Sequence, residues 1–129
     1  MLSNRILVVE DNEQNLELVL FLLEEEGIEV KTAKNVEEFQ SSLSGQIPDL
    51  VLLDMHLPGA DGLTLLKELR TTAGHENVPV VALTAHAMRG DRERFLAAGC
   101  NGYISKPIDV KTFVDEVRGY LQPTAERGK

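Results

Sequence analysis

The segment DLVLLDMHLPGADGL, which spans residues 49–63, constrains the fold of this chain more than any other stretch. It contains an uninterrupted apolar run from Leu50 to Leu53, and the next residue is the acid Asp54. An uninterrupted apolar run is typical of a strand that is buried on both faces of a parallel sheet. Parallel sheets bind their ligands just beyond the carboxyl ends of the strands. The sequence therefore predicts that Asp54 lies where such a sheet presents its chemistry.

The rest of the chain alternates between strand and helix patterns. Short apolar or alternating runs predict strands at residues 6–9, 28–33, 50–54, 78–84 and 102–105. Helical spacing of apolar residues predicts helices at residues 13–26, 35–43, 63–69, 90–98 and 109–121. The alternating pattern of the second strand favours a place near an edge of the sheet. Strict alternation of strands and helices indicates a parallel sheet covered by helices on both faces, with right-handed crossovers.

Length and charge limit the classes of protein to which the chain can belong. We expect one domain spanning residues 1–129, with a folded core at 5–121 and a polar tail at 122–129. The net charge of −8, from 13 basic and 21 acidic residues, argues against nucleic-acid binding, which needs a basic face. No signal peptide or membrane-spanning run is recognised, so we expect a cytoplasmic protein without a membrane partner. The single cysteine, Cys100, is interpreted as a small buried hydrophobic residue.

Polar residues end four of the five predicted strands. Glu10 and Asp11 follow the first strand, Asp54 ends the third, Thr84 ends the fourth, and Lys106 follows the fifth. In a parallel sheet these side chains converge on one edge, where crowded carboxylates either share a proton or bind a cation. Mg²⁺ suits carboxylate ligands and also binds phosphate oxygens, so it is the expected metal.

A carboxylate surrounded by a cation, an ammonium group and a hydroxyl group is a suitable nucleophile for phosphoryl transfer. The metal and Lys106 would neutralise the charge that develops on the transferring group, and Thr84 would donate a hydrogen bond. Each residue alone has an ordinary interpretation: Asp11 as a helix cap, Thr84 as a half-buried strand residue and Lys106 as a solvated terminus. The combination at four strand ends indicates a phosphoryl-transfer site around Asp54.

From Arg5 to Leu121 the chain resembles a response-regulator receiver domain of two-component signalling. The segments ILVVEDN, DLVLLDMHLPGADGL, VPVVALTA and GYISKP carry the resemblance. It implies a flavodoxin-like, doubly wound α/β fold with a five-stranded parallel sheet in the order 2-1-3-4-5 and five helices. It also implies a phosphoacceptor signalling domain that catalyses only its own phosphorylation and dephosphorylation.

The resemblance assigns roles to the residues at the strand ends. Asp54 is the implied phosphoacceptor, and Thr84 and Lys106 are the implied ligands of the phosphoryl oxygens. The implied magnesium ligands are the side chains of Asp11 and Asp54, the backbone carbonyl of His56, and Glu10 through a water molecule. No position of this set carries an unexpected residue type, so the resemblance implies a phosphorylatable receiver.

Further residues are implied in switching and in control of the phosphate lifetime. Thr84 and Tyr103 resemble the switch pair, in which the aromatic ring occupies the space that the hydroxyl residue leaves. The bond before Pro107 corresponds to a peptide bond that is typically cis in the family. His56 and His86 lie two residues beyond Asp54 and Thr84, and they are either ordinary loop residues or modulators of the phosphate lifetime.

The resemblance also implies the partners. A sensor histidine kinase or a histidine phosphotransfer protein would donate the phosphoryl group, and a downstream protein would bind the face formed by the fourth helix, fifth strand and fifth helix. Two other functions stay open: a docking module that is never phosphorylated, and a magnesium-dependent aspartyl phosphohydrolase. Such hydrolases usually carry a second acid two residues after the nucleophile, where this chain has His56. The residues do not decide between a free-standing regulator and the receiver of a hybrid kinase.

Overall fold

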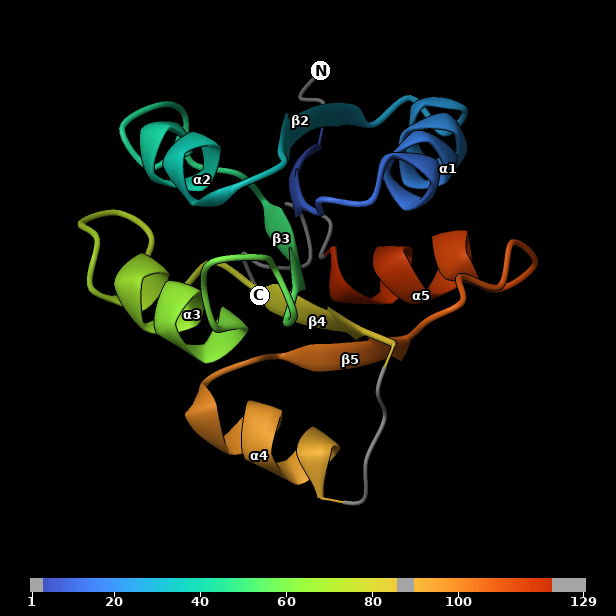
Figure 1. The fold of residues 1–129 in the computed structure, drawn as a ribbon. Helices are drawn as coiled ribbons and strands as arrows, with labels where there is room; N and C mark the ends of the chain where they lie inside the picture. Colours follow the sequence, from blue (N-terminus) through green and yellow to red (C-terminus); the bar gives the residue numbers. More distant parts are fainter. Residues whose placement is uncertain (1–3, 86–89, 122–129) are drawn as a thin grey trace, which may run out of the picture.

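The computed structural model describes residues 4–85 and 90–121, which form a five-stranded parallel sheet with helices on both sides (Figure 1). The strand order is β2-β1-β3-β4-β5, and all four strand pairs are parallel, so the predicted topology is confirmed. The strands are β1 (Arg5–Val9), β2 (Glu29–Ala33), β3 (Leu50–Asp54), β4 (Val80–Thr84) and β5 (Gly102–Ser105). The edge position predicted for the second strand is also confirmed.

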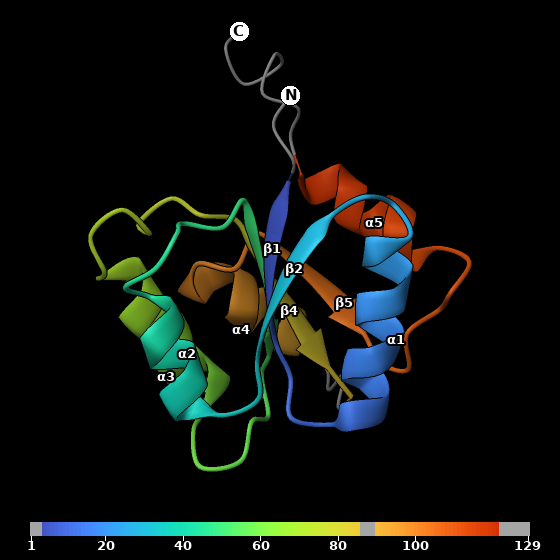
Figure 2. The same cartoon turned by 90° about the horizontal axis from the view of Figure 1, so that it is seen from above.

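The described residues form five helices. These helices cover the two faces of the sheet in unequal layers (Figure 2). They are α1 (Glu13–Glu24), α2 (Val36–Ser42), α3 (Gly62–Arg70), α4 (Asp91–Ala98) and α5 (Phe113–Tyr120). The α1 and α5 helices pack on one face, and α2, α3 and α4 pack on the other (Figures 1 and 2). No helix within the described ranges is long and apolar enough to cross a membrane.

Alternate side chains of the strands supply the two hydrophobic cores. On one face of the sheet, strand side chains such as Leu53 pack against Phe39, Leu66 and Phe95 of α2, α3 and α4. On the other face, strand side chains such as Leu52 pack against the buried residues of α1 and α5. All five residues of β3 and of β4 are buried, which explains why the central strands appear as continuous apolar runs.

The last helix begins later than predicted. Asp109 does not cap α5; its Oδ1 accepts a hydrogen bond from the Lys111 N–H at 2.9 Å, and its carbonyl oxygen accepts from Thr112 and Phe113. This bond has the spacing of an N-cap bond, but it closes a separate turn at residues 110–112 that precedes the regular helix. The helix itself therefore starts at Phe113.

The loop after β3 is fixed by close packing against the start of α3. Asp61 caps α3 through a hydrogen bond from the Leu63 N–H to its Oδ1. At the next position, a Cβ atom on Gly62 would lie 2.5 Å from the Met55 Cα, so only glycine fits there without a backbone shift. The Gly62 N–H also donates to the Met55 carbonyl oxygen at 3.2 Å. This packing fixes the backbone immediately after Asp54.

Candidate functional site

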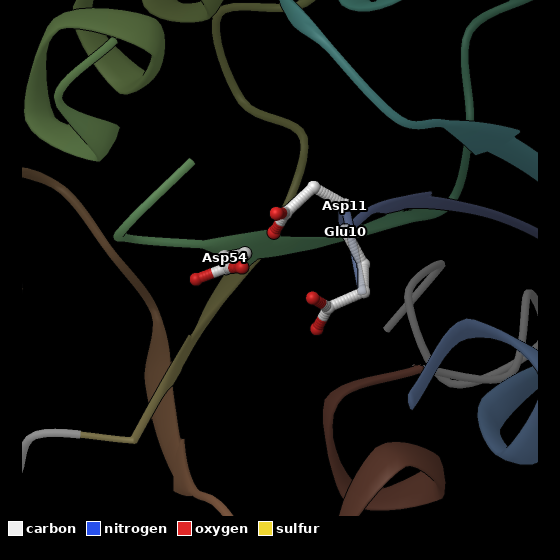
Figure 3. Close-up of side chains that lie close together, drawn as sticks. All are labelled: Glu10, Asp11 and Asp54. Atoms are coloured by element: carbon white, nitrogen blue, oxygen red, sulfur yellow. The ribbon is translucent and has the colours of Figure 1, made fainter. Parts of the chain in front are cut away.

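Three carboxylates meet at the carboxyl ends of β1 and β3 (Figure 3). Glu10 and Asp11 follow β1, and Asp54 is the last residue of β3. One oxygen from each lies within 4.8 Å of the others. The paired register of β1 and β3, in which Val9 lies opposite Leu53, places the residues that follow side by side. The predicted convergence of these three acids is therefore found in the structure.

Lys106 lies between two of these carboxylates. Its Nζ atom is 2.6 Å from the Glu10 Oε1 and 3.3 Å from the Asp54 Oδ2. Glu10 and Asp54 are both buried, with 1% and 4% of their surface exposed, and the Lys106 side chain is 11% exposed. Ion pairs removed from water are screened little by salt, so the contacts of this ammonium group with both acids persist at high ionic strength.

Backbone N–H groups orient the two buried carboxylates. The His56 N–H donates to the Asp54 Oδ1 at 2.9 Å, and the Asn12 N–H donates to the Glu10 Oε2 at 3.0 Å. The Asp54 oxygens therefore point in different directions, one toward the loop after β3 and one toward Lys106. Asp11, in contrast, is exposed at the rim.

Burial raises the pKa of Glu10 above its ordinary value of 4.5. The hydrogen bond with Lys106 and the bond from the Asn12 N–H oppose this shift, and the nearby Asp54 charge reinforces it. The net direction shows that the contact with Lys106 does not fully offset the burial of the Glu10 carboxylate.

An open cleft of about 260 Å³ lies over these groups. Its lining comprises the three acids, Lys106 and four further residues: Asn12, Asn15, His56 and Ala85. Sequence reasoning did not single out Asn15 or Ala85. Asn15 is the third residue of α1, and helical side chains lean toward the N-terminus of the helix, so its position after the acidic pair was a usable signal.

The remaining predicted residues lie around this cleft. Thr84 ends β4 next to Leu83, the register partner of Asp54, and it is completely buried rather than part of the cleft lining. The Lys106–Pro107 peptide bond is cis. Tyr103 is half-buried on β5, and its ring stacks on Phe95 with the centroids 6.2 Å apart. His86 lies outside the described residues.

The donor set of this cleft fits a magnesium ion. All three acids offer oxygen atoms, the ligand type that Mg²⁺ prefers. Among the residues that the structure describes, only one ammonium group, that of Lys106, lies beside the three carboxyl groups, so the cleft favours a divalent cation. The open cleft also leaves room for the water ligands that Mg²⁺ keeps.

Comparison with known proteins agrees with this geometry. Residues 6–118 match the sequence family of the response regulator receiver domain. The chain is 40% identical over 116 residues to the polar-differentiation response regulator DivK of Brucella anthropi. The aligned region covers 90% of this chain and 94% of that protein. The chain therefore belongs to the response regulator receiver domain family.

Solved structures show the same fold. The receiver domain of the sensor histidine kinase PA1611 from Pseudomonas aeruginosa PAO1 is 32% identical, with a TM-score of 0.82 over 93% of this chain and 98% of that one. That structure has a magnesium ion coordinated in its active site cleft. The chemotaxis response regulator CheY4 of Vibrio cholerae, at 22% identity, shares the fold with a TM-score of 0.86 over 93% of this chain and 100% of that one.

Family membership establishes the general role of the chain. It is a receiver domain of two-component signalling with a phosphoacceptor role. Receiver domains interact in general with histidine kinases and with downstream targets.

Proposed function

We propose that Asp54 accepts a phosphoryl group from a phosphohistidine donor, and that the resulting aspartyl phosphate controls binding of a downstream protein. The observation that carries this proposal is the contact between a buried Asp54 carboxylate and the Lys106 ammonium group at the base of an open cleft. A buried nucleophile beside a fixed cation is arranged for a reaction in which negative charge must be neutralised as it transfers.

The residues of this chain divide the work. The His56 N–H holds one Asp54 oxygen, which orients the carboxylate toward the cleft. Lys106 lies close enough to follow the incoming phosphoryl oxygens while keeping its contact with Glu10. Thr84, which is buried at the end of the neighbouring strand, is proposed to bind a phosphoryl oxygen after transfer.

The side chains of Asp11 and Asp54, the His56 backbone carbonyl, and Glu10 through water are proposed to hold Mg²⁺. When bound, the ion would neutralise charge on the phosphoryl oxygens. Asp11 suits direct coordination because it is exposed at the rim, whereas the Glu10 carboxylate already binds Lys106 and the Asn12 N–H.

Signal output is proposed to pass through Thr84 and Tyr103 to the face formed by α4, β5 and α5. Movement of Thr84 toward the phosphoryl group would open space beside Tyr103, whose ring now packs on Phe95 of α4. Partner binding would select one of the two arrangements. His56 and His86 remain proposed modulators of the phosphate lifetime; His56 lines the cleft, which supports access to the acyl phosphate.

The setting of this reaction follows from the same chemistry. We infer that the receiver unit, residues 5–121, works in the cytoplasm without nucleic-acid or membrane partners, in line with the charge of −8. It is inferred to act on no separate substrate. Two alternatives are a phosphohydrolase and a docking module that is never phosphorylated. Phosphoryl transfer to Asp54, partner affinity in Asp54→Asn and turnover of a phosphomonoester distinguish them from the proposal.

The test is transfer from a phosphorylated histidine phosphotransfer protein, with wild type compared with Asp54→Asn and with Asp115→Asn, an exposed acid of α5. We expect transfer to wild type and to the Asp115 variant and none to Asp54→Asn. Partner affinity that is identical in wild type and Asp54→Asn would support the docking module. Multiple turnovers of a generic phosphomonoester would support the hydrolase.

A further inference from the structure

The loop that follows Asp54 closes where Gly62, the first residue of α3, packs on Met55. The Gly62 N–H donates to the Met55 carbonyl oxygen at 3.2 Å, and the Met55 N–H donates to the Leu83 carbonyl oxygen of β4 at 3.0 Å. A Cβ atom on Gly62 would lie 2.5 Å from the Met55 Cα, 2.9 Å from its Sδ and 3.0 Å from its Cε. Residue 62 therefore approaches the Met55 backbone more closely than a side chain allows.

The backbone conformation at position 62 does not itself require glycine. Gly62 is helical, and its φ is not positive. Asp61 caps the helix by accepting the Leu63 N–H, so the start of α3 does not depend on glycine either. Alanine favours helices more than glycine does. Glycine at this position therefore costs helix stability, and the close contact with Met55 explains its presence.

A single peptide unit connects this contact to the cleft. The Met55 carbonyl and the His56 N–H belong to the same planar unit, and in a trans peptide they point in opposite directions. The carbonyl oxygen accepts the Gly62 N–H, whereas the N–H donates to the Asp54 Oδ1 at 2.9 Å. Because the unit is rigid, a displacement of Met55 at one side would also move the His56 N–H at the other.

We propose that Gly62 is a positioning residue for the cation site of the cleft. Its contact with Met55 fixes the Met55–His56 peptide unit, and this unit in turn sets the direction of the Asp54 carboxylate and the place of the His56 carbonyl oxygen. Gly62 does not line the cleft, so it acts through Met55 and His56 and touches no ligand. This inference rests on the magnesium site proposed for Asp54.

Gly62→Ala tests the inference, because it adds one methyl group at the point of contact. Titration calorimetry measures Mg²⁺ affinity without any phosphodonor, in wild type, Gly62→Ala and two controls. Gly119→Ala adds the same methyl group to α5, where nothing lies within 4 Å of the new atom. Arg70→Ala removes a donor from the Val78 and Gly99 carbonyls at the opposite end of the sheet, so it shows whether lower stability alone weakens Mg²⁺ binding.

We expect Gly62→Ala to bind Mg²⁺ at least about tenfold more weakly than wild type, the usual effect of disturbing groups that orient metal ligands. Both controls should match wild type within about twofold. An affinity within about twofold of wild type in folded Gly62→Ala would overturn the inference and leave the role of Asp54 intact. An equal loss in Arg70→Ala would do the same, because the effect would then follow stability.

A double variant keeps the test decisive if Gly62→Ala does not fold. Met55→Ala removes the Sδ and Cε atoms that crowd the new methyl group, but the Met55 Cα stays in contact. Gly62→Ala with Met55→Ala should therefore bind Mg²⁺ about tenfold more weakly than Met55→Ala alone. Equal affinity in these two variants would overturn the inference. Failure of wild type itself to bind Mg²⁺ would overturn the proposed metal site as well.

Discussion

At the carboxyl end of the sheet, Lys106 contacts two buried acids, whereas at the amino end the half-buried cation Arg70 binds only neutral acceptors. The Arg70 guanidinium donates to the Val78 carbonyl at 2.6 Å, the Gly99 carbonyl at 3.0 Å and the Asn101 Oδ1 at 3.1 Å. These bonds join the end of α3 to the starts of β4 and β5. The two cations thus hold opposite ends of the same sheet in different ways.

The two ends of the sheet differ in how the charge of the cation is balanced. Around Arg70, each contact pairs a donor with a neutral acceptor, and the Asn101 Oδ1 also accepts the Val80 N–H at 2.9 Å. Around Lys106, two buried carboxylates share one ammonium group and a third, Asp11, lies close to them, and burial raises the pKa of Glu10. We therefore assign the amino end to stabilising the fold, whereas the carboxyl end, which is proposed to bind a cation and a phosphoryl group, brings acidic side chains together at some cost in stability.

Removal of the Arg70 side chain gives the largest expected effect. Arg70→Ala leaves the Val78 and Gly99 carbonyls without this donor, and we expect the free energy of unfolding to fall by about 2–3 kcal/mol. Urea unfolding monitored by circular dichroism measures this loss. The control Arg92→Ala, at an exposed arginine of α4, should change it by less than about 0.5 kcal/mol. A loss of magnesium affinity in Arg70→Ala would contradict the separation of the two ends.

Replacement of Lys106 sharpens the comparison at the other end. Lys106→Met removes a cation 2.6 Å from Glu10, so we expect Mg²⁺ affinity to rise at least about tenfold. Without the metal, the same variant should lose stability, because two buried acids lose their shared partner. Titration calorimetry measures the affinity. Weaker binding of Mg²⁺ would show that Lys106 organises the metal site instead of competing with the ion.

Glu10→Gln tests the balance between burial and the contact with Lys106. The folded protein holds the Glu10 proton more tightly than the unfolded chain, so the free energy of unfolding falls as pH rises from 4.5 through the raised pKa. Without metal, Glu10→Gln should match wild type below pH 4.5 and exceed it at pH 7. Unfolding curves across this range measure the difference. A variant that is less stable at pH 7 would show that the pair with Lys106 outweighs burial.

Cys100 gives the smallest expected change. It lies beside the Arg70 bonds, and burial raises the pKa of its thiol from 9.0 to about 11. The thiolate fraction at pH 8 is then roughly 100-fold lower than for an ordinary thiol, and alkylation should be correspondingly slow. Phosphorylation should leave that rate unchanged, since it acts at the opposite end. Faster alkylation of the phosphorylated protein would show that the amino end takes part in the switch.

The spacing of apolar residues and the polar residues that end each apolar run predicted most of the fold. Apolar runs that end in Glu10, Asp54 and Thr84 located the strands and the edge where their ends meet, because parallel strands align their carboxyl ends. The strand order came from the resemblance to receivers, since alternation alone fixes no order. The start of the last helix was wrong because Asp109 closes a local turn instead.

The sequence did not predict which partners the long side chains contact. The sequence brought Lys106 to the acids but did not indicate that its Nζ lies closer to Glu10 than to Asp54. The Arg70 bonds join residues up to 31 positions apart, and no local pattern marks them. Asn15 was passed over because an asparagine in a first helical turn has an ordinary explanation in helix capping.

The central claim is that Asp54 accepts a phosphoryl group with the help of a divalent cation. The most direct measurement is the intact mass of wild type and Asp54→Asn after incubation with acetyl phosphate, with and without Mg²⁺. The account predicts a single phosphoryl adduct on wild type only when Mg²⁺ is present, and none on Asp54→Asn. An adduct of equal yield on Asp54→Asn, or no adduct on wild type in Mg²⁺, would contradict it.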